Sequence, residues 1–137
     1  MAEVKRVDYT GVKVLVTGGA GFIGSHLVDA LMEKGAVVTV LDDLSTGFMD
    51  NVAQWTEHPR LNFVEGDCLN QRDIYKTLKG CKLVFHLAAN PEVRAGGVDT
   101  EVDFKQNIVA THNVLEGMRK SETAKTMVFA STSTVYG

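Results

Sequence analysis

The stretch VKVLVTGGAGFIGSHLVDALMEKG, residues 12–35, decides the fold. Its first part, residues 12–18, is a short run rich in β-branched residues, which indicates a strand buried on both faces. The part after the glycines has apolar side chains at helical spacing, and Gly35 follows as the expected end of that helix. The stretch therefore predicts a strand, a glycine-rich turn and a helix.

Three glycines of the turn each have a physical purpose. Gly18 permits a tight turn, Gly21 lets the backbone approach a pyrophosphate, and Gly24 lets the helix pack closely. The same letters also satisfy G-x-G-x-x-G when the pattern is started at Gly19. Since the helix N-terminus offers free N–H groups and positive potential, the turn predicts dinucleotide binding.

The alternation of apolar strands and helices continues to the end of the chain. Further strands are expected over residues 36–42, 61–67, 82–90 and 124–132, and helices over residues 68–80 and about 100–120. Strands without polar alternation, separated by helices, predict a parallel sheet covered on both faces. We therefore expect a doubly wound, Rossmann-like α/β fold with strand order 3-2-1-4-5.

The long helix is expected to begin with a capping box formed by Thr100 and Asp103. The side chains predicted to form its apolar stripe are Phe104, Ile108, Thr111, Leu115 and Met118. The fifth strand would lie at an edge of the sheet, so apolar surface around Val128 and Phe129 is expected to be exposed there. Because such surface seeks partners, self-association, as in a homodimer, is predicted.

Composition narrows the classes of partner. The net charge is −3 without a run of like charge, which argues against nucleic acid or an anionic membrane surface as the main partner. No apolar stretch approaches the length of a membrane span, and residues 1–11 resemble no signal peptide. Cys68 and Cys81 lack metal-ligand spacing. These features predict reduced thiols and a cytoplasmic protein.

Asp42 ends the second predicted strand, 24 residues after Gly18. An acid at this place accepts hydrogen bonds from a ribose diol and repels a 2′-phosphate. No Lys or Arg occurs between Lys34 and Arg60 that could offset it. The sequence therefore predicts NAD rather than NADP. The role of Asp43 is left open, since it could simply cap the following loop.

Five motifs in order along residues 12–137 resemble those of the extended short-chain dehydrogenase/reductases. They are TGGAGFIGSHLVDALMEKG, LDDLSTG, GD, HLAA and STSTVYG. The chain looks most similar to the NAD-dependent nucleotide-sugar epimerases, and within them to the UDP-glucose 4-epimerases. The resemblance implies NAD as cofactor, a UDP-hexose as substrate and transient hydride transfer from the sugar C4.

The resemblance also implies a set of cofactor-binding residues. Asp42 would hold the adenosine ribose, Asp67 would lie against the adenine amino group, and Leu87 to Ala89 would pass beneath the cofactor. Asn107, inside the long helix, is interpreted equally as a structural brace or as a cofactor contact. The expected cofactor-binding residues are Gly18, Gly21, Phe22, Ile23, Gly24, Asp42, Asp43, Ser45, Thr46, Gly47, Asp67, Cys68, Leu87, Ala88, Ala89 and Asn107.

By the same resemblance, Thr132 is the catalytic hydroxyl that hydrogen-bonds the reacting sugar. The family's Tyr-x-x-x-Lys base is expected beyond residue 137, and neither Tyr9 nor Tyr75 is expected to supply it. The 137 residues are thus interpreted as one NAD-binding domain, truncated after strand five, without the Tyr/Lys helix and the sugar-binding lobe. We expect no epimerase turnover from this chain alone.

Other functions remain open at this level. A nucleotide-sugar 4,6-dehydratase shares the fold, but it typically shows Thr-Asp-Glu where this chain has Thr132-Ser133-Thr134. A decarboxylase of the same family, or an NAD-binding sensor without chemistry, is a further alternative. His86 is expected to be buried structure, Trp55 to pack a short helix on the sheet, and Arg94 to be either solvated or in contact with phosphate.

Overall fold

The computed structural model describes residues 7–92 and 98–132. In this part of the chain, five parallel strands form one sheet in the order β3-β2-β1-β4-β5, which confirms the predicted order. The strands are β1 (Lys13–Thr17), β2 (Val37–Asp42), β3 (Leu61–Glu65), β4 (Leu83–His86) and β5 (Thr126–Phe129). Most are shorter than predicted because the chain leaves the ladder early at the carboxyl edge, where loops replace it.

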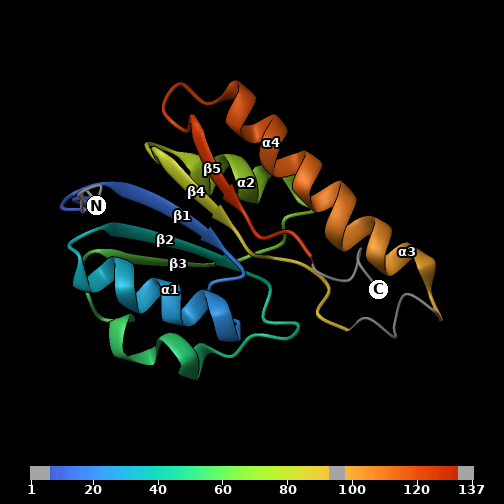
Figure 1. The fold of residues 1–137 in the computed structure, drawn as a ribbon, viewed down its shortest axis with the longest axis horizontal. Coiled ribbons are helices and arrows are strands. Elements are labelled where there is room, and N and C mark those ends of the chain that lie inside the picture. The colour runs from blue at the N-terminus through green and yellow to red at the C-terminus, as the bar shows by residue number, and fades with distance from the viewer. Residues whose placement is uncertain (1–6, 93–97, 133–137) are drawn as a thin grey trace, which may run out of the picture.

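Helices cover both faces of the sheet. They are α1 (Phe22–Glu33), the 3₁₀ helix η1 (Met49–Trp55), α2 (Gln71–Leu78), α3 (Thr100–Asp103), the π-helical segment η3 (Phe104–Val109) and α4 (Ala110–Lys120). Figure 1 shows α1 and η1 on one side of the sheet, and α2 and α4 on the other. This is the doubly wound arrangement expected from the sequence.

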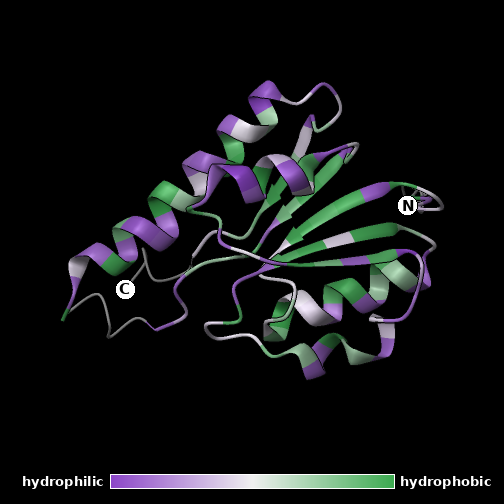
Figure 2. Ribbon diagram, turned by 180° about the vertical axis from the view of Figure 1, so that it is seen from behind, coloured by the Kyte–Doolittle hydropathy of each residue, from purple (hydrophilic) through white to green (hydrophobic). Residues whose placement is uncertain are grey.

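Side chains of the central strand alternate between two cores. Val14 and Val16 of β1 pack toward α1, while Leu15 packs toward α2 and α4, and all three are fully buried. Figure 2 shows the strands as the most hydrophobic part of the ribbon, with hydrophilic residues concentrated on the helices. Burial on both faces explains why this strand lacks polar alternation.

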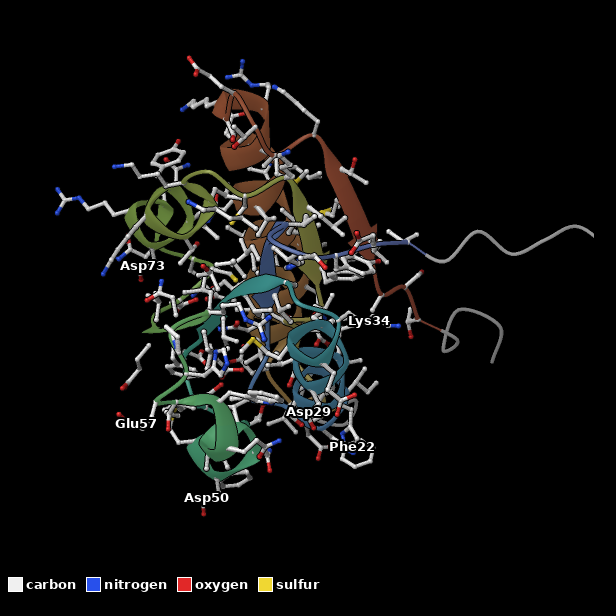
Figure 3. All side chains as sticks on the ribbon, turned by 90° about the vertical axis from the view of Figure 1, so that its left-hand side faces the viewer. Phe22, Asp29, Lys34, Asp50, Glu57 and Asp73 are labelled. Carbon is white, nitrogen blue, oxygen red and sulfur yellow. The ribbon has the colours of Figure 1, made fainter. Side chains whose placement is uncertain are left out.

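The expected short helix over the sheet is η1. Trp55 packs in the core beside α1, and its indole Nε1 donates to Asp29 Oδ1 at 2.7 Å. Asp29, labelled on α1 in Figure 3, also accepts from Gln54 at 2.6 Å. The carboxylate thereby fastens η1 to α1.

The long helix differs from the prediction in two ways. It is not α-helical throughout, since η3 interrupts it with wider turns. Its N-cap is Asp99, whose side chain accepts from the Glu101 N–H at 3.0 Å, so the expected capping box of Thr100 and Asp103 is wrong. Asp99 precedes the first helical residue and therefore reaches the free amides first.

The predicted apolar stripe of this helix is wrong at three of its five positions, whereas Met118 is buried as predicted. Phe104, Ile108 and Leu115 expose 55%, 60% and 46% of their surface. The face that is buried against the sheet and α2 instead consists of smaller residues, namely Ala110, Asn113, Val114 and Gly117, together with Met118. The close packing of α4 on α2 requires small side chains at the contact, whereas a hydrophobicity pattern indicates positions with large apolar side chains.

The edge strand β5 matches the expectation. Val128 and Phe129 are each about half exposed.

Over the residues that the structure describes, no helix is both long and apolar enough to cross a membrane.

Gly117 provides a test of this packing. A Cβ at residue 117 would lie 2.5 Å from Ile74 Cγ2 and 2.8 Å from Leu78 Cδ1, both on α2. Gly117→Leu is therefore expected to lower the free energy of unfolding by about 1–3 kcal/mol, measured by urea denaturation. The control His112→Leu places the same side chain at an exposed position of α4 and should change it by less than about 0.5 kcal/mol. Equal effects of the two substitutions would contradict the α2–α4 contact.

Candidate functional site

A cavity of about 400 Å³ lies at the carboxyl ends of the strands. All the cofactor-binding residues predicted from the sequence line it, with the single exception of Asn107. They come from the loops after β1, β2, β3 and β4, which the parallel order brings to one edge of the sheet. The lining residues that sequence reasoning missed are Leu41, Gly66, Pro91, Gln106 and Ala130.

The glycine turn forms one wall of the cavity, and its three glycines differ in their surroundings. Gly18 has φ +69°, and a Cβ there would lie 2.8 Å from the backbone N of Ala88. A Cβ at Gly24 would overlap the carbonyl oxygen of Gly18. A Cβ at Gly21 would have that same oxygen, at 3.2 Å, as its one neighbour within 4 Å among the described residues, its chain neighbours aside. Gly18 and Gly24 therefore serve the fold, while Gly21 leaves space toward the cavity.

The N-terminus of α1 opens on the same wall. Its N-cap is Gly21, and no side chain caps the first turn. Phe22 and Ile23 are largely exposed, and Figure 3 labels Phe22 at the start of the helix. The first-turn amides thus lack side-chain acceptors, and the positive end of the helix dipole favours an anionic group here.

Asp42 connects the glycine turn with the loop after β2. Its Oδ2 accepts from the Ala20 N–H and its Oδ1 from the Leu44 N–H, both at 2.9 Å. The residue is 8% exposed and lines the cavity. Each carboxylate oxygen has more than one lone pair, so both can accept a further hydrogen bond. None of the described residues that line the cavity is Lys or Arg, so the charge of Asp42 is not neutralised there.

The loop after β2 is tied to the glycine turn a second time. The Asn51 amide and the Phe48 N–H donate to the Ala20 carbonyl at 2.8 and 3.1 Å. Sequence reasoning missed Asn51, because nothing in its local pattern reveals a partner 31 residues away. Asp43 Oδ1 accepts from both the N–H and the hydroxyl of Ser45, which is the loop cap that the sequence left open.

The third loop carries Asp67 and Cys68. Asp67 Oδ1 accepts from the Leu69 N–H at 2.8 Å, which orders the turn into α2. Burial raises the pKa of the Cys68 thiol to about 12, and nearby carboxylates add to the effect, so the thiol stays neutral. Cys81 is likewise buried and free, and no cluster of metal-ligating side chains occurs among the described residues.

Leu87, Ala88 and Ala89 form the floor of the cavity, and we call them the strand-end floor. The N–H groups of Leu87 and Ala88 each lie 3.2 Å from the Thr17 hydroxyl of β1, which accepts from both. The Leu87 N–H is shared with the main-chain carbonyl of Thr17, also at 3.2 Å, whereas for the Ala88 N–H the hydroxyl takes the place of a ladder partner beyond the end of β4. The floor is thereby held against the glycine turn.

Asn107 does not line the cavity. Its Oδ1 accepts from the Asn90 N–H at 2.9 Å, and its Nδ2 donates to Asp103 Oδ1 at 3.2 Å. Gln106, the preceding residue of η3, lines the cavity instead. These hydrogen bonds are those of a brace, the first of the two interpretations that the sequence left open, and a cofactor contact of Asn107 stays a prediction.

The residues expected for chemistry lie elsewhere. Thr132 is exposed just beyond β5 and is not among the lining residues. Arg94 and residues 133–137 lie outside the described part of the chain. Tyr9 and Tyr75 each have a lysine four residues later, so the Tyr-x-x-x-Lys spacing does occur at both tyrosines. Neither tyrosine lines the cavity, and the Tyr75 hydroxyl accepts instead from Lys120.

Comparison with known proteins gives this geometry a family. Residues 14–137 match the model of the family described as "NAD dependent epimerase/dehydratase family". The chain belongs to this family. It is 37% identical over 128 residues to a UDP-glucose 4-epimerase of Mycolicibacterium smegmatis, with 92% of the chain and 41% of the relative covered.

Two further similar proteins have names that indicate different substrates. The chain is 35% identical over 144 residues to a mouse sterol-4-alpha-carboxylate 3-dehydrogenase, decarboxylating, with 98% of the chain and 36% of the relative covered. The solved structure of Thermus thermophilus UDP-glucose 4-epimerase in complex with NAD matches with TM-score 0.78 and 36% identity, covering 88% of the chain and 38% of the enzyme. The chain therefore spans about two fifths of the length of these relatives.

NAD is the cofactor of this family, and the cavity fits it. The N-terminus of α1 has no side-chain cap, so its first amides can donate to a pyrophosphate, and Gly21 leaves open space beside them. Asp42 presents a carboxylate that no described Lys or Arg of the lining offsets, and such a group can accept hydrogen bonds from an adenosine ribose. The predicted cofactor therefore agrees with the donors and the space that the residues provide.

Substitutions at two of the glycines separate binding from folding. Gly21 has φ −74° and ψ 175°, which valine adopts readily, so Gly21→Val is expected to keep the fold while its methyl groups occupy the cavity. NADH binding measured by calorimetry should vanish, with a change in Tm below about 5 °C. Gly24→Ala should instead destabilise the chain, because its Cβ meets the Gly18 oxygen. Retained NADH affinity in Gly21→Val would place the phosphates elsewhere.

Asp42 is expected to set the preference for NAD over NADP. Asp42→Asn removes the charge that repels a 2′-phosphate, so the ratio of NADH to NADPH affinity should fall by about 10-fold, or ~1.4 kcal/mol. Asp50→Asn, on the exposed side of η1, removes the same charge away from the cavity and should leave the ratio unchanged. Calorimetric titration of both dinucleotides measures this, and equal affinities in the unmodified chain would contradict it.

Proposed function

We propose that this chain is the NAD-binding domain of a nucleotide-sugar epimerase that interconverts UDP-glucose and UDP-galactose. The carrying observation is the cavity in which Asp42, the glycine turn and the strand-end floor meet. Similarity to UDP-glucose 4-epimerases in both sequence and structure supports the substrate class. The proposal includes a cytoplasmic location and residues 1–137 as one domain of a longer enzyme.

Some residues of the chain would bind the cofactor, and one, Thr132, would contact the reacting sugar. When bound, NAD supplies reversible hydride acceptance at the sugar carbon. The glycine turn and the α1 N-terminus bind its phosphates, and Asp42 orients its adenosine end. The hydroxyl of Thr132 would hydrogen-bond the reacting sugar hydroxyl, so that the proton to be removed points toward a base. That base is expected outside the 137 residues, as the family resemblance implies. Tyr9 and Tyr75 do not line the cavity, and Tyr136 lies outside the described residues.

A second candidate comes from the sterol-related dehydrogenase that matches 98% of the chain. Its name indicates a dehydrogenase, and the epimerase reaction that we propose also begins with oxidation of an alcohol, a step that the cavity would serve equally. A 4,6-dehydratase is less well supported because Ser133 and Thr134 replace the acids that elimination requires. Self-association also belongs to this proposal, and the half-exposed Val128 and Phe129 support it.

The substrate class can be tested with a chimera. Residues 1–137 replace the matching part of the M. smegmatis UDP-glucose 4-epimerase, and conversion of UDP-galactose to UDP-glucose is followed by a coupled assay. The chimera is expected to turn over, with Thr132→Val lowering kcat by about 100-fold and Thr132→Ser retaining most activity. The 137-residue chain alone should show none.

NADH binding and circular dichroism confirm first that each chimera is folded. A second chimera, with the corresponding remainder of the mouse sterol enzyme, tests the alternative. Turnover only in the second chimera would contradict the nucleotide-sugar assignment. Full kcat in Thr132→Val would remove Thr132 from the chemistry.

A further inference from the structure

His86, the last residue of β4, connects the sheet with the long helix. It is 1% exposed, and both of its ring nitrogens have partners. Nδ1 lies 2.7 Å from the hydroxyl of Thr17, and Nε2 lies 2.9 Å from the hydroxyl of Thr111. Burial lowers the pKa of His86 to about 4, so near pH 7 the ring is neutral and carries one N–H.

The helix side decides which nitrogen carries the proton. The Thr111 hydroxyl donates to the main-chain carbonyl of Asn107 at 2.5 Å, and a carbonyl only accepts. Since the single hydroxyl proton of Thr111 is used there, its oxygen offers only lone pairs to His86. Nε2 must therefore be the donor.

The sheet side leads to the same tautomer. The Thr17 hydroxyl oxygen accepts from the Ala88 N–H and from the Leu87 N–H, which it shares with the Thr17 main-chain carbonyl at 3.2 Å, so its lone pairs are directed to these donors. Its own proton then points to His86, so Nδ1 accepts and bears no hydrogen. One neutral tautomer satisfies every member, and no buried side-chain polar atom of the described residues lacks a partner.

This ordered chain of hydrogen bonds ends on two sides of the cavity. One end is the strand-end floor, held through Thr17. The other end is η3, where Gln106 lines the cavity and the Asn107 side chain holds the Asn90 main chain. A residue needed only to fill the core would be apolar, because an imidazole must be fully hydrogen-bonded to be buried at little cost.

We propose that His86 is a positioning residue for the dinucleotide: as the Nε2–H imidazole it holds the strand-end floor and the wide turn of η3 in register on two sides of the cavity. It does not line the cavity and acts through Thr17 and Thr111. The inference rests on the proposed placement of the cofactor in this cavity.

The tautomer is tested on the cofactor-free chain. Long-range ¹H–¹⁵N correlation spectra at pH 7 should show His86 as the Nε2–H form. Thr111→Val removes the acceptor, so the proton should move at least partly to Nδ1 and disturb Thr17, shifting the Leu87 and Ala88 amide signals. Thr111→Ser keeps a hydroxyl and should restore both readouts. An Nδ1–H ring in the unmodified chain, or unmoved amides in Thr111→Val, would overturn the proposal.

The positioning role is tested by NADH affinity, corrected for the folded fraction. Thr111→Val should weaken binding by about 10-fold, since an unsatisfied buried donor disturbs the floor, and Thr111→Ser should restore it. His112→Val is the matched control, a valine at the neighbouring exposed position, and should bind as the unmodified chain does. Unchanged affinity in Thr111→Val would reduce His86 to a brace of the fold. An unchanged ratio of NADH to NADPH affinity in Asp42→Asn would contradict the placement of the cofactor instead, and leave the tautomer result standing.

Discussion

The architecture depends on one close approach, between the turn after β1 and the end of β4. At Gly18 the backbone has φ +69°, and a Cβ would lie 2.8 Å from the backbone N of Ala88. Only glycine meets both requirements. Because no side chain stands between them, the glycine turn and the strand-end floor form one continuous wall, and Thr17 can receive the amides of Leu87 and Ala88. The shape of the cavity and the hydrogen bonds of Thr17 to the strand-end floor thus both depend on the close approach at Gly18.

The second determinant of the site is charge, from the carboxylate of Asp42 and the N-terminus of α1. The carboxylate of Asp42 holds the Ala20 and Leu44 amides and so fixes the shape of both loops around it. The same carboxylate faces the cavity, where no described lining residue carries a positive side chain. A single residue therefore shapes the site, and we propose that the same residue selects against a 2′-phosphate. The N-terminus of α1 supplies the opposite polarity a few residues away, which suits a ligand with an anionic middle and a diol at one end.

Local sequence patterns predicted the strand order and the glycine turn, because strand, turn and helix are adjacent in the chain, and the family resemblance implied most of the other residues that line the cavity. What they missed depends on packing between distant segments. The long helix buries Gly117 against α2 instead of its large apolar residues, which a hydrophobicity pattern cannot indicate. The wide turn of η3 directs Gln106 rather than Asn107 to the cavity. Asn51 and the two hydroxyl partners of His86 come from elements far apart in sequence, so no spacing rule reveals them.

The most direct test of the central claim is a titration of the ¹⁵N-labelled chain with NAD⁺, followed by amide chemical shifts. If the dinucleotide lies in the cavity, the largest shifts fall on residues 18–24, 42–47 and 87–89, at the carboxyl edge of the sheet shown in Figure 1. Signals of Tyr75, Lys79 and Lys120, which line a second hollow between α2 and the end of α4, should stay in place. Shifts concentrated at that second hollow, or none at saturating NAD⁺, would contradict the assignment of this cavity to the cofactor.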